Sequence, residues 1–120
     1  MEATGATVGA ELAVRLERHP AVITEDLPDI YASIARENPP AAEQVLEAVE
    51  ATFAQLTQQP ECGVTYRSRN RSLPDVRMLP VIGFANYLVF YRIEVEAIRI
   101  LYVVHGARHL PRFFQREPRG

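Results

Sequence analysis

The spacing of hydrophobic positions changes along the chain, and the first change separates a strand from a helix. Apolar and polar residues alternate over residues 11–18, which is the period of a half-buried strand. Pro20 ends this strand, because proline has no N–H to donate to a strand ladder. Over residues 27–35 the apolar residues recur at intervals of three and four, which predicts an amphipathic helix with Thr24 or Asp26 as its N-cap.

A second helical stripe follows almost at once. It covers residues 42–56, begins after Asn38-Pro39-Pro40 and ends at Gln58-Gln59-Pro60. Because only the Asn-Pro-Pro break separates the two helices, we expect them to form an antiparallel helix hairpin.

The second half of the chain predicts strands. A polar stretch, residues 61–75, reads as a loop that carries Arg67, Arg69 and Arg71. Three strand-like segments follow, at residues 76–82, 87–94 and 97–105. The last two are so close that they must form a β-hairpin, with Val95-Glu96 as its tight turn.

That turn fixes a register in which Arg92 faces Arg99, Phe90 faces Leu101 and Leu88 faces Val103. One face of the hairpin then carries a continuous apolar surface for the helices to cover, made of Tyr87, Val89, Tyr91, Ile93, Ile98, Ile100, Tyr102 and Val104.

The opposite face of the hairpin is the candidate partner site. Leu88, Phe90, Leu101 and Val103 lie there with little else to cover them, so we expect an exposed apolar surface. Beside it, two directly opposed arginines are unfavourable unless an anion or a carboxylate lies between them. This pairing predicts a ligand or an acidic partner.

Length and composition fit one domain. The chain has 120 residues, 48% of them hydrophobic, and we expect a flexible leader at 1–10, a domain at 11–114 and a tail at 115–120. A single cysteine, Cys62, excludes an internal disulfide and favours the cytoplasm. The longest uncharged apolar run is too short to span a membrane. His105 and His109 have no third ligand nearby, so neither a metal nor a cofactor is expected.

Charge divides the chain into two unlike halves. Residues 1–61 hold three arginines and eleven acidic residues, whereas residues 62–120 hold ten arginines and four acidic residues. This asymmetry predicts a basic surface on the second half that meets an acidic partner or a nucleic acid. Every basic residue other than histidine is arginine, which recognises carboxylates and phosphates with a planar fork.

The order β-α-α-β-β-β, the strand Tyr-Leu-Val-Phe-Tyr-Arg at 87–92 and the segment Val-Val-His-Gly-Ala-Arg at 103–108 carry a resemblance. The chain resembles the ParE branch of the ParE/RelE superfamily of bacterial type II toxin–antitoxin systems, over nearly all of its length after residue 11. The resemblance implies an α+β fold in which an N-terminal strand and a helix hairpin pack on a small, mostly antiparallel sheet.

The resemblance also implies a function in plasmid stabilisation or stress response. A ParE-like toxin inhibits DNA gyrase, is not known as an enzyme, and is held inactive in a hetero-oligomer by an antitoxin. That antitoxin is expected to be a small DNA-binding protein with an acidic, amphipathic C-terminal tail. The expected binding surface for antitoxin or target consists of Arg77, Leu88, Phe90, Arg92, Arg99, Leu101, Val103, His105 and Arg108.

Two alternatives remain open. RelE-like toxins are ribosome-dependent mRNA endoribonucleases, and the groups that would serve such chemistry here are Arg77, Arg92, His105 and Arg108. The absence of lysine, and of any carboxylate between residues 76 and 92, favours a toxin without catalytic residues. The second alternative is an inactive relic that still binds an antitoxin.

Overall fold

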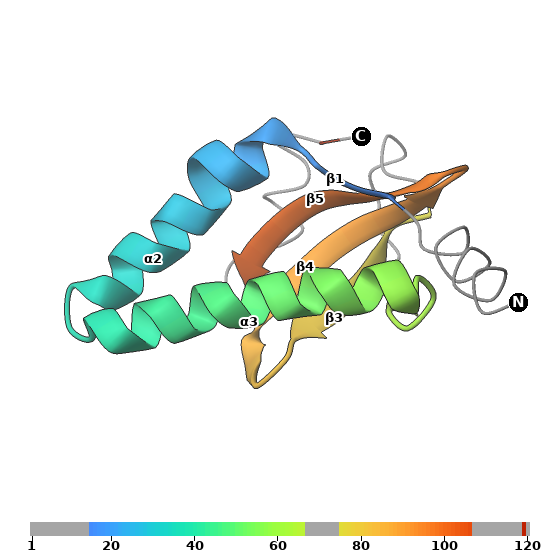
Figure 1. Cartoon of the computed structure of the whole chain (residues 1–120). Coiled ribbons are helices and arrows are strands. Elements are labelled where there is room, and N and C mark those ends of the chain that lie inside the picture. Colours follow the sequence, from blue (N-terminus) through green and yellow to red (C-terminus); the bar gives the residue numbers. More distant parts are fainter. Residues whose placement is uncertain (1–14, 67–74, 107–118, 120) are drawn as a thin grey trace, which may run out of the picture.

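A computed structural model describes residues 15–66, 75–106 and 119, which form one strand, a helix hairpin and then four strands (Figure 1). The elements are β1 (Arg15–Arg18), the π-helical segment η1 (Val22–Asp26), α2 (Leu27–Ala35), α3 (Pro39–Gln58), β2 (Val64–Thr65), β3 (Arg77–Val81), β4 (Phe84–Glu94) and β5 (Ala97–His105). The predicted order is confirmed, with the two-residue strand β2 as an addition inside the segment predicted to be a loop. The predicted leader, the arginines of residues 67–71 and the predicted tail segment 115–118 lie outside the described residues.

The five strands form one mixed sheet in the order β1-β5-β4-β3-β2. β1 runs parallel to β5, and the other neighbouring strands are antiparallel. Figure 1 shows α3 lying across the strands, with α2 as the first arm of the hairpin, leading into the N-terminal end of α3. The main core lies between this hairpin and the sheet, where Val49 and Phe53 of α3 meet Val89 and Ile98. The predicted α+β architecture is therefore confirmed.

Helix α3 begins where the Asn-Pro-Pro segment predicts. Asn38 is its N-cap, because the Asn38 Oδ1 atom accepts a hydrogen bond of 3.1 Å from the Ala41 N–H. Thr52 is a polar residue on the buried face of α3. Its hydroxyl donates to the Ala48 carbonyl at 2.7 Å and accepts from the Ile82 N–H at 3.0 Å, so α3 is tied to the β3–β4 turn.

The start of α2 differs from the prediction. Asp26 occupies the N-cap position of α2, but neither it nor Thr24 caps the helix: the backbone of Asp26 is helical and its side chain makes no capping hydrogen bond, because helical backbone begins at Pro20 and runs through η1 into α2. The Thr24 hydroxyl therefore donates to the Pro20 carbonyl one turn earlier, at 3.2 Å. Asp26 lies inside the helical segment, and its carboxylate accepts a hydrogen bond from the backbone of β5 instead.

The hairpin register agrees with the prediction only near the turn. Arg92 pairs with Arg99 and Tyr91 with Ile100, but a β-bulge then shifts the register by one residue, so that Phe90 pairs with Tyr102 and Leu88 with Val104. The predicted pairings of Phe90 with Leu101 and of Leu88 with Val103 are therefore wrong.

The extra residue in β5 also exchanges faces. Val103 packs in the core under the helices, whereas Tyr102 and Val104 join the cluster on the opposite face. The predicted faces were the reverse for these three residues, because one inserted residue inverts the alternation of every residue after it.

Tyr91 connects the sheet to the segment after α3. Its side chain is fully buried, and its hydroxyl donates to the Pro60 carbonyl at 2.7 Å and accepts from the Gly63 N–H at 2.9 Å. Burial raises the pKa of the Tyr91 phenol above its ordinary value. Gly63 approaches so closely that a Cβ atom there would collide with the Tyr91 hydroxyl and the Met78 carbonyl. Only glycine fits this position without a shift of its neighbours.

Candidate functional site

Arg92 and Arg99 are the two predicted binding residues that the structure brings together. They pair across β4 and β5. Both lie on the face of the sheet away from the helices. Arg92 is two residues from Phe90 along β4, so the two side chains point to the same face, and Phe90 belongs to the cluster on that face. Their side chains are 17% and 27% exposed, so each guanidinium is partly accessible to a partner.

Two carboxylates flank this arginine pair. A Glu94 oxygen lies 3.5 Å from Arg92 Nη2, and a Glu17 oxygen on β1 lies 3.8 Å from Arg99 Nη1. Glu17 is closer to Arg15, at 2.8 Å. Ion pairs between partly exposed groups contribute up to about 1 kcal/mol each. The chain thus supplies carboxylates that offset the repulsion only weakly, and the guanidinium groups keep the capacity to bind an acidic partner.

The predicted exposed apolar surface is wrong. Phe90 and Leu101 are completely buried, and Leu88 is partly buried. They form a second core on this face with Val76 and Tyr102. The ring of Tyr66 packs edge-on against Phe90, with centroids 5.0 Å apart. Val103, the fourth predicted apolar contact, is buried on the helix-covered face because of the bulge.

Arg77 lies apart from the arginine pair. It is opposite Tyr91, whose side chain belongs to the core beneath the helices, so Arg77 projects from the helix-covered face. Its Nη1 atom donates to the Gly63 carbonyl at 2.9 Å and to the Glu61 carbonyl at 3.4 Å. These contacts give Arg77 a structural role in holding the segment after α3 against the sheet.

His105 lies at the far end of β5, on the same face as Arg77. It pairs with Tyr87, and the two rings meet edge to face with centroids 5.0 Å apart. Tyr87 is five residues from Arg92 along β4, which corresponds to about 16 Å of strand. His105 and Arg92 are therefore far apart and on opposite faces. Arg108 lies outside the described residues.

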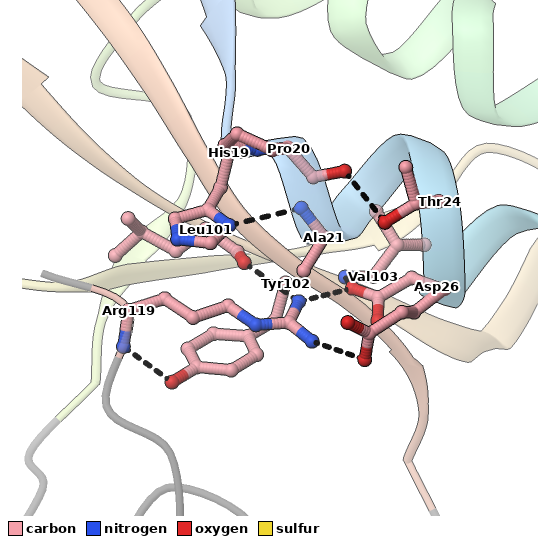
Figure 2. A network of polar contacts seen from close by, with 10 residues as sticks. His19, Pro20, Ala21, Thr24, Asp26, Leu101, Tyr102, Val103 and Arg119 are labelled. Atoms are coloured by element: carbon pink, nitrogen blue, oxygen red, sulfur yellow. Dashed lines mark hydrogen bonds and ion pairs between the residues drawn. The ribbon is translucent and has the colours of Figure 1, made fainter.

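A buried polar network, absent from the sequence-based predictions, lies where β1 ends beside β5 (Figure 2). The carboxylate of Asp26 forms a 2.7 Å ion pair with Arg119, and the two side chains are only 6% and 4% exposed. The same carboxylate accepts from the Val103 N–H at 3.0 Å, and Arg119 donates to the Leu101 carbonyl at 3.1 Å. The network thus satisfies backbone groups of β5 beyond the end of β1.

His19 stands beside this network. Its Nδ1 atom accepts a hydrogen bond of 3.0 Å from the Ala21 N–H, which places the proton of the neutral imidazole on Nε2. Burial lowers the pKa of His19, and the positive charges of Arg119 and Arg99 lower it further. The neutral form of His19 is therefore the form that fits the folded chain.

The described residues offer neither a metal-binding cluster nor a helix that could span a membrane. Within residues 15–66, 75–106 and 119, no group of three or more His, Cys, Asp or Glu side chains is placed to hold a metal ion. In the same part of the chain, no helix has the length and apolar character needed to cross a membrane.

A family model and a solved structure both relate the chain to ParDE toxin–antitoxin systems. The model of the ParE toxin of the type II toxin–antitoxin system parDE matches residues 17–110. Among solved structures, a chain of the chromosomal ParDE toxin–antitoxin system from P. aeruginosa is similar, with a TM-score of 0.64 and 20% sequence identity. The match covers 78% of this chain and 96% of that chain. No curated protein matches the sequence significantly.

Proposed function

The chain belongs to the ParE toxins of type II toxin–antitoxin systems, and from this premise we propose that it inhibits DNA gyrase by binding rather than by catalysis. Its activity is proposed to be neutralised by an antitoxin in a toxin–antitoxin hetero-oligomer. The site of action is the bacterial cytoplasm, and the role is plasmid stabilisation.

One observation carries the choice of a binding function over RNA cleavage. Catalysis requires the acid, the base and the phosphate clamp to surround one reacting group within hydrogen-bond reach. Arg77 donates to backbone carbonyls on the helix-covered face, His105 packs against Tyr87 at the distant end of β5, and Arg92 lies on the opposite face. This separation supports a toxin that acts through a contact surface.

The contact surface that we propose is centred on Arg92 and Arg99. These two guanidinium groups are partly exposed, and their carboxylate contacts of 3.5 and 3.8 Å are long enough for a partner to replace. An acidic segment would gain charge-assisted, bidentate hydrogen bonds from both arginines. The acidic tail of the antitoxin and an acidic region of gyrase are proposed to compete for this arginine pair.

The test is to induce the chain alone in a bacterial host and to follow incorporation of labelled thymidine and labelled methionine. Gyrase inhibition predicts that DNA synthesis falls while translation continues. Purified toxin should also inhibit supercoiling of plasmid DNA by purified gyrase, and an antitoxin that binds the toxin should restore supercoiling. Translation that stops first, with intact DNA synthesis, would contradict the proposal and favour the endoribonuclease.

Matched variants identify the surface. Arg92→Gln with Arg99→Gln should abolish the inhibition of supercoiling, whereas Arg36→Gln at the exposed residue that follows α2 should leave it unchanged. His105→Gln should also retain inhibition, because His105 lies far from the arginine pair. A complete loss of toxicity in His105→Gln with the fold retained would favour a catalytic site. A wild-type chain that affects neither synthesis would be an inactive relic.

A further inference from the structure

The network around Arg119 has the composition of a binding site for a guanidinium group. The guanidinium donates to the carboxylate of Asp26 and to the carbonyl of Leu101, and a Glu25 oxygen lies 3.8 Å away. Its central carbon lies over the ring of Tyr102, 4.5 Å from the ring centroid. Figure 2 shows Asp26 of η1 and Leu101 and Tyr102 of β5 around the arginine.

The end of β1 explains why such a site exists at this place. β1 pairs with β5 only as far as Ile100, so the Leu101 carbonyl and the Val103 N–H face no strand neighbour from β1. A buried carbonyl requires a donor, and a buried N–H requires an acceptor. Asp26 supplies the acceptor, but it brings a buried negative charge that itself requires a cation.

A guanidinium meets all these requirements at once. Its Nη1 atom donates to both the Asp26 carboxylate and the Leu101 carbonyl, its Nη2 atom faces Glu25, and its flat face lies over the Tyr102 ring. An ammonium group has the same charge but neither the planar fork nor the flat face. The two side chains of the ion pair are almost fully buried, so the site is enclosed rather than a chance contact on the surface.

We propose that Asp26, Glu25, Tyr102 and the Leu101 carbonyl form a guanidinium-binding site, with Arg119 as its intramolecular ligand. The ligand class of the site is an arginine side chain or another monosubstituted guanidinium. By filling this site, Arg119 contacts Asp26 of η1, 93 residues away in the sequence, and Leu101 of β5, 18 residues away. The site is independent of the arginine pair proposed for target binding.

The experiment empties the site and refills it with a small probe. In the full chain, Arg119→Ala leaves Asp26 buried without its cation, and the Tm should fall by about 10 °C or more. Methylguanidinium chloride at about 20 mM should then raise the Tm of this variant by several degrees, because a ligand that binds only the folded state stabilises it. Methylammonium chloride at the same concentration should not, and neither salt should stabilise the wild-type chain.

Two variants keep the test decisive. Arg119→Lys preserves the charge, but its Tm should still lie well below that of the wild type, because an ammonium group lacks the planar guanidinium and its flat face. Asp26→Asn combined with Arg119→Ala keeps an oxygen for the Val103 N–H and should remove the response to methylguanidinium. If Arg119→Ala does not fold by itself, the same comparison is made as recovery of circular dichroism on addition of each salt.

Several results would overturn the proposal. One is a Tm of Arg119→Ala as close to wild type as that of Arg36→Ala, which removes an exposed arginine from the end of α2. Another is equal rescue by methylammonium and methylguanidinium, which would mean that the site needs only positive charge. A third is a methylguanidinium response that persists without the carboxylate of Asp26.

Discussion

Arg92 and Arg99 lie directly opposite each other on β4 and β5, and each has a carboxylate oxygen within 4 Å. The repulsion between the two cations and the attraction to Glu94 and Glu17 act in opposite directions, and each contributes at most about 1 kcal/mol. Arg92→Gln should therefore change the free energy of unfolding by less than about 0.5 kcal/mol. Urea denaturation at low and high salt measures this. A loss of several kcal/mol would mean that Arg92 is a structural residue and would remove it from the proposed binding surface.

Tyr91→Phe tests the connection between β4 and the segment after α3. The variant keeps the buried ring but removes the partner of the Pro60 carbonyl and of the Gly63 N–H. We expect a loss of about 1–3 kcal/mol in the free energy of unfolding, because buried polar groups are left unsatisfied. Tyr31→Phe is the control, since it removes one exposed hydrogen bond to Glu43 and should cost less than about 0.5 kcal/mol. Equal effects would contradict the assigned role of Tyr91.

Gly63→Ala should destabilise the fold by about 1–3 kcal/mol, because the added methyl group displaces the Tyr91 hydroxyl or the Met78 carbonyl. The effect should be smaller in the background of Tyr91→Phe, which removes the hydroxyl but keeps the ring carbon Cε1 and the Met78 carbonyl as obstacles. A double-mutant cycle by chemical denaturation measures this coupling. Additive effects would show that the methyl group does not meet the Tyr91 hydroxyl.

His19 gives stability a pH dependence with a definite sign. Its pKa in the folded chain lies below the ordinary value of 6.5, so the unfolded chain binds more protons as the pH falls through 6.5. The free energy of unfolding should therefore be highest above this pH and should decrease until the pH passes below the folded pKa. His19→Asn should lose less stability than the wild type between pH 8 and pH 5, measured by urea denaturation. An equal loss in both proteins would assign the acid sensitivity to other groups.

The turn and cap chemistry of the chain made much of the fold predictable. The two-residue turn at Val95-Glu96 fixes the pairing of Arg92 with Arg99, and Asn38 before two prolines fixes the start of α3. The bulge escaped prediction because residues 100–104 are all apolar, so their pattern carries no alternation from which to determine the phase of the strand. Without that phase, Val103 and Tyr102 were predicted on the wrong faces.

The polar network around Asp26 could not be predicted from the sequence near Asp26. Asp26 precedes a helical stripe, which is a common position for an N-cap, and nothing nearby in the sequence indicates that helical backbone already begins at Pro20. Its partner Arg119 is 93 residues away. A contact at such a separation leaves no periodic signal in the sequence, whereas the arginine pair is visible because a short hairpin connects its two members.

The long separation of Asp26 and Arg119 has a consequence for the time course of synthesis. At about 5–20 residues per second, the ribosome needs about 5–20 s to travel from one to the other. During this interval η1 already carries its carboxylate, but β5 is made only late in it and the arginine that neutralises the carboxylate only at its end. The parallel pairing of β1 with β5 must wait for the same reason. The nascent toxin therefore cannot complete its sheet until nearly the whole domain has been translated, and its toxicity should begin only after that delay.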